Sequence, residues 1–78
     1  MSEDELQERL SSIVNDMDFL TDADKVLTGY ALMEKIIEYR NNARKEKNWA
    51  IADKVRNLFD SISIVLKDTK EATIWEEK

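Results

Sequence analysis

The fold is decided in residues 43–56, which read ARKEKNWAIADKVR. Apolar residues recur at helical spacing on both sides of the polar connection Lys47-Asn48, so one helix ends and another begins within this stretch. Asn48 is a favoured N-cap residue, which predicts that the second helix starts at Trp49 and continues to about Ile62. Because so short a connection joins neighbours that run in opposite directions, we expect an antiparallel helix hairpin.

The first helix of this hairpin is predicted to run from an N-cap at Thr21 to about Glu46. Gly29 interrupts it at a cost of up to about 1 kcal/mol relative to alanine, so the helix either kinks there or starts later. Ahead of it, Ser2 and Glu5 have the spacing of a capping box, which predicts an acidic amphipathic helix over residues 3–17. The positions expected to form the apolar faces are Leu6, Leu10, Ile13, Val14, Met17, Val26, Leu27, Tyr30, Met33, Ile36, Ile37, Ala43, Trp49, Ile51, Ala52, Val55, Leu58, Phe59 and Ile62.

The spacing of apolar residues changes from helical to alternating after Ile62. Residues 63–67 favour a strand, residues 68–71 a turn and residues 73–75 a returning strand. The sequence therefore predicts a mainly α fold, a small helical bundle of about three helices with a short C-terminal β-hairpin. We expect one domain over residues 1–78, made of an acidic N-terminal helix (1–20), the helix hairpin (21–62) and the β-hairpin (63–76).

Composition excludes several classes of function. The chain contains no cysteine and no histidine, so it lacks disulfides, thiolates and the commonest general base and metal ligand. We therefore expect no catalytic site in this chain. The acidic N-terminus lacks the features of a signal peptide, and no apolar run approaches the roughly 20 residues that span a bilayer. A cytoplasmic location without a membrane partner is expected.

Charge is distributed unevenly along the chain, whose formal net charge is -5. Residues 1–24 hold eight acidic residues and one basic residue, whereas residues 25–78 hold eleven basic and nine acidic residues. The local excess of positive charge comes from Arg40, Arg44, Lys45, Lys47, Lys54 and Arg56. A patch of this kind can attract phosphates even when the whole chain is acidic.

Three blocks of the sequence carry a family pattern: residues 43–56, residues 64–69 (IVLKDT) and residues 72–75 (ATIW). In this order they resemble the C-terminal anticodon-binding region of cysteinyl-tRNA synthetases, over roughly residues 36–76. Ser63 and Ala72 stand where this family usually has glycine. Because a left-handed residue with a side chain costs roughly 1–2 kcal/mol, the backbone near Asp68 is expected to differ from the family geometry.

The resemblance implies that Arg44, Asp53 and Asp68 read the anticodon. A carboxylate accepts hydrogen bonds from guanine or from the cytosine amino group, and an arginine fork binds acceptor edges and phosphates. Each residue also has a simpler structural interpretation. Arg44 would complement the helix dipole, and Asp53 would pair with Arg56 one turn along the helix. Asp68 would cap the hairpin turn through its own side chain.

Trp49 and Trp75 are the available planes for stacking unpaired bases, as in most sequence-specific RNA sites. Their simpler interpretation is that both lie in the core, between the helix that starts at Trp49 and the β-hairpin. The candidate RNA-binding residues are therefore Arg44, Asp53, Asp68, Trp49 and Trp75.

The resemblance further implies a function for the whole region: recognition of the anticodon stem-loop of the tRNA for cysteine, and presentation of that tRNA to a catalytic domain of the same polypeptide. The parent enzyme would be a class I cysteine–tRNA ligase that uses ATP and zinc. This chain has neither a HIGH-like nor a KMSKS-like signature and no cysteine or histidine to bind zinc, so we expect no cofactor in it. The alternative is a free-standing helical module that binds protein or RNA without a role in aminoacylation.

Overall fold

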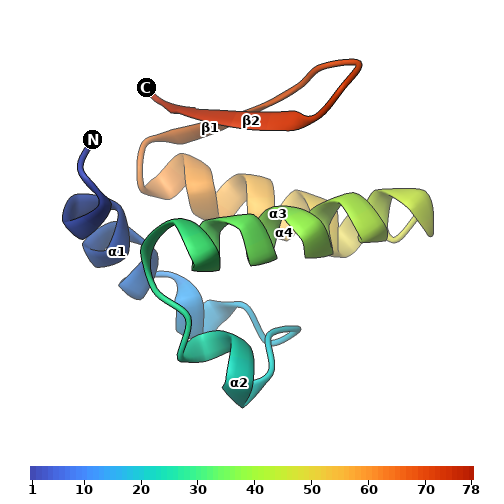
Figure 1. The fold of residues 1–78 in the computed structure, drawn as a ribbon. Coiled ribbons are helices and arrows are strands. Elements are labelled where there is room, and N and C mark those ends of the chain that lie inside the picture. Colours follow the sequence, from blue (N-terminus) through green and yellow to red (C-terminus); the bar gives the residue numbers. More distant parts are fainter.

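The computed structural model describes all residues from Met1 to Lys78. The elements in chain order are α1 (Glu3–Ser11), the 3₁₀ turn η1 (Val14–Asp16), α2 (Asp22–Lys25), α3 (Gly29–Lys45), α4 (Trp49–Ser61), β1 (Ile64–Asp68) and β2 (Thr73–Glu77). The predicted mainly α fold with a C-terminal β-hairpin is confirmed. Figure 1 shows that the β-hairpin and α2 lie on opposite sides of the α3–α4 pair.

The two strands pair antiparallel in one register. Leu66 lies opposite Trp75, and Asp68 lies opposite Thr73 at the turn end. The turn itself is closed by Thr69, whose backbone N–H and hydroxyl both donate to the carbonyl of Ala72, at 2.9 and 2.7 Å. The interpretation of Asp68 as the cap of this turn is therefore wrong. Its carboxylate forms hydrogen bonds with other side chains instead.

The core lies between α1, α3, α4 and the first residue of β1. It is one cluster of buried side chains: Leu6, Leu10, Ile13, Met17, Leu20, Leu32, Met33, Ile36, Val55, Phe59 and Ile64. Met33 and Ile36, from the predicted stripe on α3, are fully buried. Burying a side chain of this size contributes about 1.5–3 kcal/mol, so this cluster is the main source of stability in a chain this small.

The first helix is shorter than predicted, because it ends at Ser11 and is followed by a 3₁₀ turn instead of reaching Met17. The hydroxyls of Ser11 and Ser12 donate to the carbonyls of Gln7 and Arg9, at 2.8 and 2.7 Å. Serine side chains that bond backbone carbonyls in this way compete with the helix and favour its termination. Ser2 caps the other end, where its hydroxyl accepts the backbone N–H of Glu5.

The long helix predicted from Thr21 is interrupted between Lys25 and Gly29. Thr21 does act as an N-cap, in a full capping box with Asp24, but the helix that it starts has a single turn. Gly29 begins α3 with a φ of +55°, a left-handed conformation that suits glycine. Val26 lies in the interruption and is 77% exposed, so its assignment to the apolar face is wrong.

The connection between α3 and α4 is a left-handed helix end. Lys47 has a φ of +60°, and the N–H groups of Lys47 and Asn48 donate to the carbonyls of Arg44 and Ala43. This is the Schellman arrangement, in which glycine is the usual left-handed residue. Asn48 takes the predicted N-cap position of α4, but its side chain makes no capping hydrogen bond.

Ser63 has a φ of +62° between α4 and β1. Ser63 is therefore left-handed at a position where the family usually has glycine, and its side chain carries the steric cost. Ala72 is not left-handed.

Candidate functional site

A cluster of polar side chains joins the C-terminal half of α3 to the turn end of the β-hairpin. Asp68 is at its centre. Arg40 donates to both carboxylate oxygens, from Nη1 to Oδ1 at 2.6 Å and from Nη2 to Oδ2 at 2.8 Å. Arg44 Nη1 donates to Oδ2 at 2.5 Å, and the hydroxyl of Thr73 lies 2.9 Å from Oδ1. Two of the predicted anticodon readers, Arg44 and Asp68, are thus direct partners.

The four contacts use the acceptor capacity of the Asp68 carboxylate, which has about four lone-pair positions. The hydrogen bonds from Arg40 are the main cause of a pKa for Asp68 well below the usual range of an aspartate, and those from Thr73 and Arg44 act in the same direction. Asp68 is therefore ionised and fully partnered in the free chain at neutral pH.

Asp53 stands apart from this cluster, on the second turn of α4. It is exposed and forms no ion pair, so the predicted pair with Arg56 is absent. Its carboxylate makes no hydrogen bond with the rest of the chain. An aspartate without a partner on a helix surface keeps all its acceptor positions available for a ligand.

Trp49 is at the start of α4, one turn before Asp53, so the two side chains share one face of the helix. It is 54% exposed, which makes its interpretation as a core residue wrong. The core side of α4 is provided by Ala52, Val55 and Phe59 instead.

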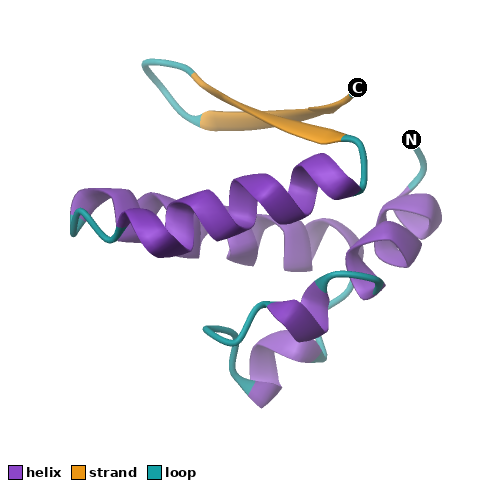
Figure 2. Ribbon diagram, turned by 180° about the vertical axis from the view of Figure 1, so that it is seen from behind, coloured by secondary structure: helices purple, strands orange, loops and turns teal.

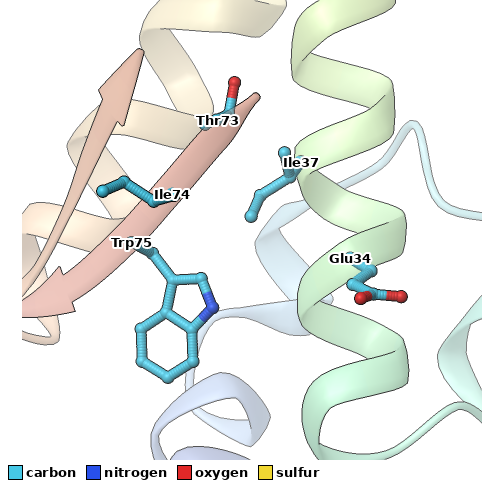
Figure 3. A pocket seen from close by; sticks show the side chains of 5 residues that line it. All are labelled: Glu34, Ile37, Thr73, Ile74 and Trp75. Carbon is cyan, nitrogen blue, oxygen red and sulfur yellow. The ribbon is translucent and has the colours of Figure 1, made fainter. Parts of the chain in front are cut away.

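Trp75 is partly buried and packs against the core. Its ring lies 6.2 Å from that of Tyr30, with 38° between the planes. Its aromatic neighbour is thus on α3, while the core cluster that it packs against also includes Val55 and Phe59 of α4. Figure 3 shows the indole beside an open pocket of about 380 Å³ between α3 and β2, lined by Glu34, Ile37, Thr73, Ile74 and Trp75. Thr73 belongs both to this pocket and to the Asp68 cluster.

The surroundings of Arg44 hold more basic than acidic residues, with Glu46 and Glu71 opposing three lysines. The α3–α4 connection and the turn of the β-hairpin lie at the same end of the molecule in both Figure 1 and Figure 2. Lys45 and Lys47 are in or beside the first of these segments, Lys70 is in the second, and all three are exposed and form no ion pair. Lys54, by contrast, pairs with Asp18 at 3.2 Å.

Sequence reasoning missed Arg40 as a site residue, although it was counted in the basic patch. It also missed Asn41 and Thr73, whose side chains donate and accept within the same cluster. The only signal in the sequence was the spacing of Arg40 and Arg44, four residues apart on a helix, which places both on one face.

The residue types that most often bind zinc are missing from this chain. The chain has no cysteine or histidine, and no group of three or more Asp or Glu residues is arranged to hold a metal ion. The zinc that the resemblance implies for a parent enzyme therefore does not fit these residues. None of the helices has the length and apolar character needed to cross a membrane.

Comparison with known proteins confirms the resemblance to cysteinyl-tRNA synthetases. The chain is 38% identical over 68 residues to the cysteine–tRNA ligase of Baumannia cicadellinicola, a match that covers 85% of this chain and 15% of the relative. It is 50% identical over 44 residues to the ligase of Fusobacterium nucleatum and 52% identical over 44 residues to that of Finegoldia magna. These two matches cover 56% of the chain.

The chain thus spans only 9–15% of the length of these relatives. The Baumannia match extends beyond the half of the chain that carries the motifs. No family model matches the chain, and no solved structure matches it.

Proposed function

We propose that this chain, which is related to a small part of the cysteine–tRNA ligases, binds the anticodon stem-loop of the tRNA for cysteine. One observation carries the proposal. Arg44 and Asp68, which the resemblance names as anticodon readers, come from separate elements and are in contact at 2.5 Å. Their contact lies at the end of the molecule that also holds the unpaired Lys45, Lys47 and Lys70. A negatively charged loop would meet favourable charge there.

The candidate residues offer complementary chemistry to unpaired bases. Arg44 uses one N–H group on Asp68 and keeps the others for acceptor edges or phosphates. Asp53 offers a free carboxylate to amino groups of cytosine or guanine. Trp49 presents an exposed indole on the same helix face, suited to base stacking, which contributes about 1–3 kcal/mol per base in single-stranded sites. Trp75 would supply a second plane beside its pocket.

In this proposal the chain presents the bound tRNA to a catalytic domain of the same polypeptide. The ATP-dependent activation of cysteine and the zinc site would reside in that domain, since this chain has no HIGH-like or KMSKS-like signature and no cysteine or histidine. A role in tRNA charging would place the protein in the cytoplasm, where translation occurs.

The proposal is tested with Asp53→Asn, which removes the anionic acceptor and preserves the side-chain shape. The chain is titrated with the anticodon stem-loop for cysteine and with a stem-loop of altered anticodon. We expect the preference for the cognate loop to fall by about 1–3 kcal/mol, the range for a direct base contact. Thermal unfolding should be unchanged, because Asp53 has no partner in the chain.

Asp4→Asn is the matched control, because it removes the same charge from an exposed position on α1, at the other end of the chain. It should leave the preference intact. If Asp53→Asn weakens binding to both stem-loops by one factor, Asp53 does not read the anticodon. An unchanged preference would lead to the same conclusion.

A further inference from the structure

Arg40 makes two of the four hydrogen bonds to the Asp68 carboxylate, yet neither the motifs nor the basic patch gives it a role of its own. Its guanidinium spans the Asp68 carboxylate with two hydrogen bonds. Nη1 also donates to Asn41 Oδ1 at 2.9 Å and lies 3.4 Å from the hydroxyl of Thr73. It therefore fastens the turn end of the β-hairpin to α3.

The two arginines that bind Asp68 differ in how they are held. The Arg40 side chain is 13% exposed and engages both carboxylate oxygens, whereas the Arg44 side chain is 43% exposed and engages one. Arg44 has no other partner in the chain. Of its five N–H donors, four remain for a ligand. Arg40 is thus the fixed partner of Asp68, and Arg44 is the accessible one.

We infer that Arg40 is a positioning residue for RNA binding: it holds Asp68 against α3, and Asp68 in turn holds the guanidinium of Arg44 ready for an acceptor on the RNA. The inference rests on the proposed function. In the free chain Asp68 then orients both arginines, and its acceptor positions are occupied.

The arrangement has an energetic consequence for binding. A long arginine side chain that is ordered before RNA binds loses less conformational entropy on binding. If Arg44 leaves Asp68 to reach the RNA, Arg40 and Thr73 still satisfy the carboxylate. The Asp68 carboxylate is therefore not left without a partner when Arg44 moves to the RNA. An unpaired carboxylate would oppose that move.

The first test needs no RNA. The titration of the Asp68 carboxyl is followed by ¹³C NMR in the wild-type chain, in Arg40→Lys and in Arg44→Lys. Because a lysine cannot span both carboxylate oxygens, Arg40→Lys should raise the pKa of Asp68 further than Arg44→Lys does. An equal or larger rise in Arg44→Lys would overturn the inference, since Arg44 would then be the principal anchor.

The second test measures binding to the cognate and altered stem-loops as a function of salt. Arg40→Lys should reduce the preference for the cognate loop by about two- to tenfold, the factor that corresponds to ordering one long side chain. The salt dependence is measured in Arg40→Gln, because Arg40→Lys keeps the positive charge. The slope of the logarithm of affinity against the logarithm of salt should stay the same in Arg40→Gln, because a positioning residue contacts no phosphate.

Arg9→Lys is the matched control. Arg9 also fastens the β-hairpin, through Glu77 at 2.9 Å, but at the other end of the strands, and it donates to the carbonyl of Ile62 at the end of α4 at 3.2 Å. It should lower stability without changing the preference between stem-loops. If loosening either end of the β-hairpin were enough to weaken recognition, both Arg40→Lys and Arg9→Lys would reduce the preference for the cognate stem-loop.

The outcomes separate this inference from the proposed function. A wild-type chain that binds both stem-loops equally contradicts the proposed function, and the positioning role falls with it. A wild-type preference that survives Arg40→Lys overturns the positioning role alone. So does a salt slope that becomes shallower in Arg40→Gln by about one phosphate contact, because Arg40 would then bind the RNA directly.

Discussion

Asp68 couples the β-hairpin to α3 through a carboxylate that is ionised in the folded chain. Its partners are two arginines and a hydroxyl, and the side chain is 42% exposed. Solvent weakens such pairs, so the coupling is worth less than the same contacts would be in a core. Its value for the molecule is geometric, because it fixes where the strands end relative to α3.

The stability that Asp68 contributes should depend on pH. The folded-state pKa of Asp68 is lowered by its arginine partners, so the contribution is full above the unfolded value of about 4 and declines as the pH falls below it. At pH 7, Asp68→Asn should lower the free energy of unfolding by about 1–2 kcal/mol, a figure discounted for solvent screening.

Urea unfolding of the wild-type chain and of Asp68→Asn between pH 2 and pH 8 would check this prediction. The gap between the two should be constant from about pH 5 upward and should narrow below about pH 4. Asp53→Asn, which removes an aspartate without a partner, should unfold at the same urea concentration as the wild-type chain at pH 7. A gap for Asp68→Asn that widens on acidification would contradict the assignment.

At the scale of elements, the acidic helix α1 completes the N-terminus of α3. Thr28 is the N-cap residue of α3 but makes no side-chain capping bond. Instead Gln7 Oε1 accepts the N–H of Gly29 at 2.6 Å, and Glu3 Oε2 accepts the N–H of Tyr30 at 3.1 Å. A carboxylate at this position also complements the helix dipole. The role of α1 is therefore to cap the N-terminus of α3 and to pack against that helix.

Gly29→Ala should be strongly destabilising. The left-handed backbone costs roughly 1–2 kcal/mol with a side chain, and the added Cβ would collide with the Glu3 carboxylate and displace that cap, which is worth about 1 kcal/mol more. In a Glu3→Ala background the collision is gone, and Gly29→Ala should cost only the backbone part. Urea unfolding of the four chains in this cycle measures the difference. Equal costs in both backgrounds would show that Glu3 and Gly29 do not interact.

This capping arrangement also explains which elements could be predicted. The α3–α4 hairpin and the strands follow from local periodicity, and Met33 and Ile36 are buried as that periodicity predicts. The break after Lys25 could not be predicted with certainty, because the groups that satisfy the start of α3 come from Glu3 and Gln7, more than twenty residues away. Local sequence offered only Gly29 as a warning.

The candidate site was predicted in part for the same reason. Arg44 and Asp68 were identified through the family pattern, but their contact depends on how the β-hairpin lies on α3. Arg40 had no motif to mark it. Trp49 was misassigned because it is the first residue of α4. At a helix end, a residue with the spacing of the buried face can still be exposed to solvent, as Trp49 is.

At the scale of the whole molecule, charge separates along the chain and in space. The first twenty-four residues hold eight acidic residues against one basic residue, and the α3–α4 connection and the turn of the β-hairpin carry unpaired lysines near Arg44. An RNA loop would approach this end of the molecule and be repelled from α1. Because few cations are available and the net charge is -5, binding by the isolated chain should be weak.

We propose that the end of the molecule around Arg44, with the α3–α4 connection and the turn of the β-hairpin, recognises an anticodon loop. The most direct measurement is a titration of the wild-type chain with the anticodon stem-loop for cysteine and with a stem-loop of altered anticodon, at several salt concentrations. We predict tighter binding to the cognate loop and a shallow logarithmic salt slope of about -1.4 to -2.8, as expected for two to four phosphate contacts with a single strand. Equal affinity for both loops, or a much steeper slope, would show that the chain binds RNA only through charge and would contradict the account.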